Sequence, residues 1–166
     1  ADVIHCMRTV FPIPLGEASS FEPSLAERTA RAAAIEATRE GLHWTFAPVV
    51  DIARDQRWGR VAETTGEDTY LASVFAAARV RGFQGEDLTA DDSLLATPKH
   101  FAAYGAVVAG LDYNTTDLSP QSLHEIHLPP FKAAIDAGAL TIMSSFNDIN
   151  GVPATANREL LTGVLR

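Results

Sequence analysis

Residues 23–51 read PSLAERTARAAAIEATREGLHWTFAPVVD, and this stretch decides the fold class. Its first part is rich in Ala, Glu and Arg with apolar residues on one face, which predicts a helix over residues 23–40. Ser24 with Glu27 three positions later forms a possible capping box, and Gly41 is a natural helix stop. Residues 43–50 then predict a short buried strand that ends at Asp51.

The same alternation continues on the C-terminal side of this stretch. Helical patterns cover residues 67–85, ending near Gly82 and Gly85, and residues 119–137, ending at Gly138. Apolar runs at residues 93–97 and 139–146 predict further strands, and Asn157 is expected to cap a last helix. Alternating strands and helices predict βαβ units and a parallel sheet, which is an α/β fold. A complete (β/α)₈ barrel takes roughly 250 residues, so a chain of 166 residues supplies only part of a TIM-like barrel. A small doubly wound sheet, complete in itself, is the alternative.

Composition and charge exclude several classes of partner. The formal net charge is −8 and no Lys/Arg cluster relieves it, so nucleic acid is a poor candidate. No apolar run is long enough to span a membrane. Cys6 is the only cysteine, so an internal disulfide cannot form. A neutral ligand such as a sugar is compatible with this charge balance.

Ionisable and polar side chains follow every predicted strand. Asp2 and His5 flank the apolar pair at residues 3–4, an Asp/Arg-rich loop begins at Asp51, and Lys99 and His100 follow residues 93–97. Ligands of parallel sheets bind at the carboxyl ends of the strands, so these groups are candidates for one site. Carboxylates accept from adjacent sugar hydroxyls, and Arg or Lys donates to their oxygens. The candidates for such a role are Asp2, Arg60, Lys99 and His100, with Trp58 as an apolar face for a sugar ring. The alternative for most of the loop that contains Asp51, Arg54, Asp55, Arg57 and Arg60 is that these charges pair with one another.

Several motifs resemble those of glycoside hydrolase family 3, and most of all its bacterial β-glucosidases. They occur in family order over nearly the whole chain: Asp2-Val3-Ile4-His5, Phe11-Pro12-Ile13-Pro14-Leu15-Gly16, Ala47-Pro48-Val49-Val50-Asp51, Arg57-Trp58-Gly59-Arg60, Glu63-Thr64-Thr65-Gly66-Glu67-Asp68-Thr69-Tyr70, Lys99-His100-Phe101-Ala102-Ala103-Tyr104-Gly105, Tyr113-Asn114-Thr115 and Asn147-Asp148-Ile149-Asn150-Gly151-Val152-Pro153. Each motif alone is weak, whereas the ordered set is highly specific.

The resemblance implies which residues bind substrate. Asp2, Arg60, Lys99 and His100 match family residues that hold the hydroxyls of the glucose in subsite −1, and Met143 matches a methionine that lines this pocket. In relatives, the Lys-His pair is joined by a non-proline cis peptide bond. Phe146 falls where several relatives carry a tyrosine that contacts the nucleophile.

The resemblance also implies a retaining double displacement by two carboxyl groups. The nucleophile is an Asp at the end of the next strand, expected beyond Arg166, and the acid/base is supplied from a later region. We therefore assign no catalytic residue within the chain, and we expect residues 1–166 to be a partial catalytic barrel domain. Its expected partners are the remainder of the barrel, a second α/β domain and a β-glucoside or oligosaccharide substrate such as cellobiose. The expected location is periplasmic or secreted.

The sequence departs from the family pattern at two places, and two further sets of residues have ordinary structural explanations. Cys6 stands where relatives usually have glycine, so the loop after the first strand is expected to differ. The Asp-x-His pair of the N-acetylglucosaminidase branch is missing after His100, which favours a glucosidase or xylosidase. His124 and His127 are three apart, unlike the zincin spacing, so neither a metal nor a cofactor is expected. Glu63 and Glu67 are interpreted as partners of the loop arginines.

The leading hypothesis is an enzyme that hydrolyses terminal β-D-glucosyl residues with retention of configuration. A β-xylosidase or an enzyme of mixed specificity is the second hypothesis, because the choice depends on space and partners for the C6 hydroxymethyl group beside Asp2. A non-catalytic relative that only binds sugars is the third.

Overall fold

The computed structural model describes residues 1–4 and 7–166. Its α-helices are α1 (Pro14–Ala18), α2 (Pro23–Arg39), α3 (Thr69–Gln84), α4 (Pro120–Ser122) and α5 (Pro129–Asp136). Its strands are β1 (Lys99–Phe101), β2 (Met143–Ser144), β3 (Asp148–Ile149) and β4 (Val152–Pro153). Single turns of 3₁₀-helix span Val61–Glu63, Tyr104–Ala106, Val108–Gly110 and Ala154–Ala156, and π-helical turns span Leu123–His127 and Glu159–Val164. His5 and Cys6, and with them the expected change in the first loop, lie outside the described residues.

Four extended segments lie side by side in chain order. The Phe46 N–H donates to the Ala1 carbonyl at 2.8 Å, parallel bridges join Trp44 to Leu95 and Val49 to Lys99, and β1 pairs in parallel with β2. The predicted strands at residues 43–50 and 93–97 are thus extended and parallel, but they are joined only by isolated bridges. Pro48 and Pro98 lack an N–H group and interrupt their ladders. The parallel α/β arrangement predicted from the sequence is present.

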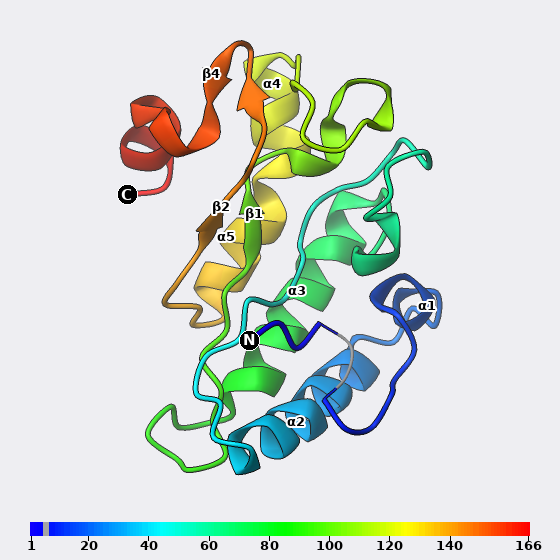
Figure 1. The fold of residues 1–166 in the computed structure, drawn as a ribbon, viewed down its shortest axis with the longest axis vertical. Coiled ribbons are helices and arrows are strands. Elements are labelled where there is room, and N and C mark those ends of the chain that lie inside the picture. Colours follow the sequence, from blue (N-terminus) through cyan, green and yellow to red (C-terminus); the bar gives the residue numbers. More distant parts are fainter. Residues whose placement is uncertain (5–6) are drawn as a thin grey trace.

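The three long helices lie together behind these segments, on one side of them (Figure 1). Helix α3 packs against both α2 and α5. Small alanine side chains on the inner face of α2 let it approach closely, and they share one apolar core with Leu94 and Ala96 of the third extended segment. The opposite side of the segments carries a hydrogen-bonded row in which Trp44 Nε1 donates to Thr97 Oγ1 at 2.6 Å and the Thr97 and Thr141 hydroxyls lie 2.8 Å apart.

Two details of the helix termini differ from the sequence prediction. The capping box at Ser24 is not formed: Pro23 occupies the first turn of α2, and Ser24 Oγ donates instead to the Glu22 carboxylate at 2.7 Å. Gly82 does not end α3 but lies inside it, where a Cβ would come within 2.3 Å of the Glu27 carbonyl oxygen in α2. This glycine therefore serves the contact between two helices, and Gly85, at a φ of +66°, follows the last residue of α3.

The helical region predicted at residues 119–137 is divided into three parts. The Ser119 side chain caps its start by accepting from the Ser122 N–H, and Gly138 at a φ of +100° follows its end. The π-helical turn precedes Pro129 and Pro130, which lack N–H donors for the preceding turn, so the helix restarts as α5. Asn157 caps the last helical turn through a 3.0 Å bond from the Leu160 N–H, as predicted.

Candidate sugar-binding site

The candidate site lies where the parallel segments end, with groups from all four converging there. Lys99 of β1 donates through Nζ to the Asp2 carboxylate at 2.8 Å. The Lys99 side chain is 3% exposed, whereas that of Asp2 is 45% exposed. A buried ammonium is thus fixed against a carboxylate that still faces solvent, and both retain hydrogen-bonding capacity for a ligand.

His100 is held from behind by Asp51. The Asp51 Oδ2 atom lies 2.8 Å from His100 Nδ1 and accepts from the His100 backbone N–H at 3.1 Å. Both side chains are buried, so the imidazole has little freedom to turn. The Lys99–His100 peptide bond is cis, as the family resemblance implied. Asp51 therefore fixes the orientation of the ring and leaves Nε2 as its other polar atom.

Arg60 is clamped by Glu63, three residues further along the chain. Arg60 Nε and Nη2 donate to the two carboxylate oxygens at 2.7 and 2.8 Å. The hydrogen bond with Glu63 raises the pKa of Arg60. Burial alone would raise the pKa of Glu63, but the hydrogen bond from Arg60 and the charges of Arg60, Lys99 and His100 together outweigh it and lower that pKa. The second terminal nitrogen of Arg60 takes no part in this fork with Glu63.

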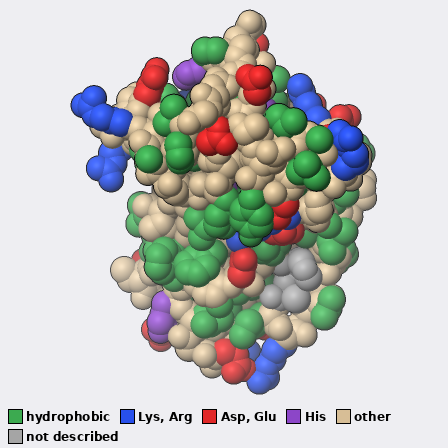
Figure 2. Space-filling view, turned by 45° about the horizontal axis from the view of Figure 1, so that its top comes forward, with side chains coloured by type: hydrophobic (Ala, Val, Ile, Leu, Met, Phe, Trp, Pro, Cys, Tyr) green, Lys and Arg blue, Asp and Glu red, His purple; other side chains and the backbone are tan. Residues whose placement is uncertain are grey.

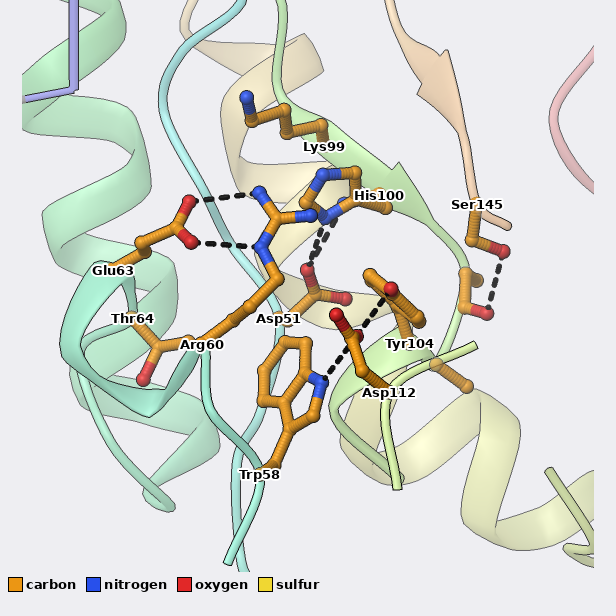
Figure 3. A network of polar contacts seen from close by, with 12 residues as sticks. Asp51, Trp58, Arg60, Glu63, Thr64, Lys99, His100, Tyr104, Asp112 and Ser145 are labelled. Atoms are coloured by element: carbon orange, nitrogen blue, oxygen red, sulfur yellow. Dashed lines mark hydrogen bonds and ion pairs between the residues drawn. The ribbon is translucent and has the colours of Figure 1, made fainter. Parts of the chain in front are cut away.

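A fourth polar network lies beneath Arg60 and was not predicted from the sequence. The Tyr104 hydroxyl and Trp58 Nε1 both donate to Asp112 Oδ1. Burial favours the neutral acid, but these two hydrogen bonds, the charge of Arg60 and the Tyr113 backbone N–H together outweigh it and lower the pKa of Asp112. The Arg60 guanidinium carbon lies 5.7 Å from the centre of the Tyr104 ring, so the buried ring of Tyr104 supports Arg60. Figure 3 shows Arg60 between Glu63 and the ring of Tyr104, with Asp51 beneath His100.

Several sequence predictions for this loop need correction. The Trp58 side chain is 1% exposed and packs in the core, so its indole face is closed to a sugar. Among the loop charges, only Asp55 and Arg57 pair with each other, at 2.6 Å, while Asp51 and Arg60 turn to partners outside this set. The interpretation of Glu63 as a partner of a loop arginine is confirmed. Glu67 is absent from the ion pairs of the described residues.

The structure thus brings together Asp2, Lys99, His100 and Arg60, which are far apart in the sequence. His100 and Arg60 both contact Tyr104, since the His100 and Tyr104 ring centroids lie 5.1 Å apart. Met143 pairs in register with Lys99 across the ladder and is half-buried beside it. Phe146, 53% exposed, lies 5.5 Å from His100 between ring centroids. The only sequence signal for Tyr104 was its place in the Lys-His motif, and Asp112 had none.

Chemically, the cluster offers carboxylate acceptors next to cationic donors over a short span. Such alternation suits a neutral polyol, whose hydroxyl groups both donate and accept. Within residues 1–4 and 7–166, no group of three or more His, Cys, Asp or Glu side chains has a geometry that could hold a metal ion. In the space-filling view, hydrophobic side chains gather across the middle of one face, with acidic and basic side chains among them (Figure 2). The same described part of the chain contains no helix with the length and apolar character needed to cross a membrane.

Comparison with known proteins identifies relatives of this chain. The family model described as the glycosyl hydrolase family 3 N terminal domain matches residues 2–166. A periplasmic beta-glucosidase of Salmonella typhimurium is 48% identical over 99% of this chain, and a putative beta-xylosidase of Formosa agariphila is 42% identical over 95%. The chain spans only 22% and 21% of the length of these two relatives.

Solved structures of a beta-glucosidase also resemble this chain over its whole length. The beta-glucosidase from Listeria innocua in complex with glucose superposes with a TM-score of 0.96 at 48% identity, covering all of this chain and 24% of that one. A mutant of the same enzyme was solved in complex with laminaribiose, with the same TM-score.

Proposed function

Since the chain belongs to glycosyl hydrolase family 3, we propose that it supplies most of the glucose-binding groups of a retaining β-glucosidase. One observation carries the proposal: Asp2, Lys99, His100 and Arg60 converge at one end of the parallel segments. The glucose complex of the Listeria innocua enzyme supports it, because that enzyme matches this chain over its whole length. The periplasmic name of the Salmonella relative favours a periplasmic or secreted location.

In this proposal, each group has a defined task toward the terminal glucose. Asp2, which is still half-exposed, accepts hydrogen bonds from two adjacent sugar hydroxyls, and Lys99 Nζ donates to the oxygens of these hydroxyls. His100, held by Asp51, presents Nε2 to a further hydroxyl. Arg60 donates through the nitrogen that Glu63 leaves free, and Met143 provides an apolar wall beside Lys99.

We further propose that residues 1–166 are part of a (β/α)₈ barrel. The four extended segments follow one another in chain order with the long helices on one side, which is the order of a barrel, whereas a doubly wound sheet reverses order and carries helices on both faces. The uncovered side includes Trp44, whose indole bonds to Thr97 there and which is 47% exposed, so later strands would bury it. The remainder of the barrel and a second α/β domain are the proposed partners.

The nucleophile and the acid/base are proposed to come from those later parts, so this chain contributes binding and no catalytic residue. Binding groups alone still decide the rate, because hydrogen bonds that strengthen in the transition state lower its free energy. In the full-length protein, we expect Arg60→Ala to lower kcat/KM on an aryl β-glucoside about ten- to a hundredfold, from the loss of a hydrogen bond to a charged group. An unchanged kcat/KM would remove Arg60 from the site.

A β-xylosidase or an enzyme of mixed specificity is the second candidate, favoured by the Formosa agariphila relative. The comparison of kcat/KM on aryl β-glucoside and aryl β-xyloside by the full-length protein decides between them. A protein that binds glucose but hydrolyses neither substrate is the non-catalytic alternative. Cellobiose is the proposed natural substrate, and the direct assay measures its hydrolysis to glucose.

A further inference from the structure

Tyr113 is an exposed aromatic residue that the proposed glucose-binding groups do not use. Its side chain is 65% exposed, and its backbone has a φ of +63°. A bulky residue in this left-handed region is strained, and such strain persists only where the surrounding structure fixes it. The strained backbone therefore holds the ring in an exposed position, and burial of the ring does not offset the free-energy cost of the strain.

The loop that carries Tyr113 is tied down on both sides. The Val108 N–H donates to the Thr115 carbonyl at 2.9 Å and closes the loop, and Asn114 Nδ2 donates back to the Val108 carbonyl at 3.1 Å. Immediately before Tyr113, the Asp112 carboxylate accepts from Tyr104 and Trp58 in the core. These contacts fix the position of Tyr113 without burying its ring.

An unbroken chain of aromatic rings links Tyr113 to the proposed glucose site. The ring centroids of His100 and Phe146 lie 5.5 Å apart, and those of Phe146 and Tyr113 lie 5.4 Å apart at an angle of 69°. Tyr113 also lies 6.1 Å from Tyr104, the ring that supports Arg60. Tyr113 is thus one ring farther out than Phe146, and it is more exposed than Phe146.

From this geometry we propose that Tyr113, with Phe146, forms a platform for the sugar ring of the leaving group. The inference rests on the proposed function, because a leaving group exists only if a glycosidic bond is cut at the neighbouring site. The faces of a pyranose are rich in C–H groups, which pack on an aromatic ring. The outward position of Tyr113 corresponds to the second sugar of a β-linked disaccharide.

The test compares substrates that share the glucose but differ in the leaving group. For the full-length protein, kcat/KM is measured on cellobiose and on methyl β-glucoside. Tyr113→Gly removes the ring and suits the positive φ, so it does not strain the loop. Tyr113→Asn, which also tolerates this conformation, is the second variant, and Tyr113→Phe keeps the platform. Tyr70→Ala removes a tyrosine of similar exposure, 77%, from α3 and is the matched control.

We expect Tyr113→Gly and Tyr113→Asn to lower the ratio of the two kcat/KM values, cellobiose over methyl β-glucoside, roughly two- to tenfold. Tyr113→Phe and Tyr70→Ala should leave the ratio unchanged, and the inhibition constant of glucose should not move in any variant. An unchanged ratio in active Tyr113→Gly and Tyr113→Asn proteins overturns the platform alone, as does an equal loss on both substrates. A wild-type protein that hydrolyses neither substrate overturns the proposed function, and the platform with it.

Discussion

Replacing Glu63 by glutamine isolates the contribution of the clamp on Arg60. The wild-type carboxylate accepts two hydrogen bonds from the guanidinium at 2.7 and 2.8 Å, and both side chains are mostly buried, with 21% of Arg60 and 25% of Glu63 exposed. Glu63→Gln keeps the shape but can accept only one of these bonds, and it removes the charge. Arg60 is then free to turn away from the position in which we propose that it meets the sugar.

The size of the effect follows from that geometry. A hydrogen bond to a charged group contributes about 1.5–3 kcal/mol, and the remaining amide oxygen retains about half of the interaction with Arg60. A loss of about 1–1.5 kcal/mol in transition-state stabilisation lowers kcat/KM about five- to tenfold. Initial rates of the full-length protein on an aryl β-glucoside measure it directly.

The same loop provides a matched control. Asp55 accepts from Arg57 Nε at 2.9 Å and from Nη2 at 2.6 Å, and the hydrogen bonds from Arg57 lower the pKa of Asp55 to about 2. The Arg57 side chain is 72% exposed, so solvent screens that pair and Asp55→Asn should change kcat/KM less than twofold. Wild-type activity in Glu63→Gln, or an equal loss in Asp55→Asn, would refute the reasoning.

Two further predictions concern stability. In Gly82→Ala the new methyl group would lie 2.3 Å from the Glu27 carbonyl oxygen, so α2 and α3 must separate. The free energy of unfolding should therefore fall by about 1–3 kcal/mol. Gly163→Ala is the control: no neighbouring atom lies nearer than 3.9 Å, so the thermal midpoint should not change. Burial lowers the pKa of His127 to about 4, below its ordinary value of 6.5. Between these two pH values, the unfolded chain binds more protons than the folded chain. The free energy of unfolding therefore falls as the pH is lowered from 6.5 to 4. His127→Phe should flatten this part of the curve of thermal midpoint against pH, and an unchanged curve would show that His127 is not buried in its neutral form.

The amino-acid sequence alone determined the α/β class, the order of helices and strands, and the family. Helix periodicity, glycine at helix ends and short apolar runs are local signals, and each was found in the structure at or near its predicted position. The capping box at Ser24 is not formed because Glu22, and not Ser24, occupies the N-cap position, and Gly82 was misread because its purpose lies in another helix. The first error is local, whereas the second arises because a contact distant in sequence overrides a local preference.

Only the tertiary structure decided how the candidate site is supported. Trp58 is an aromatic residue of the kind that can pack on a sugar ring. It points into the core because Asp112, 54 positions away, accepts its indole N–H. Asp51 belongs to an arginine-rich loop, yet it pairs with His100, 49 positions away, because the two segments are parallel neighbours. A motif specifies which side chains are present. Their direction depends on hydrogen-bond partners and burial that exist only once the parallel segments have come together.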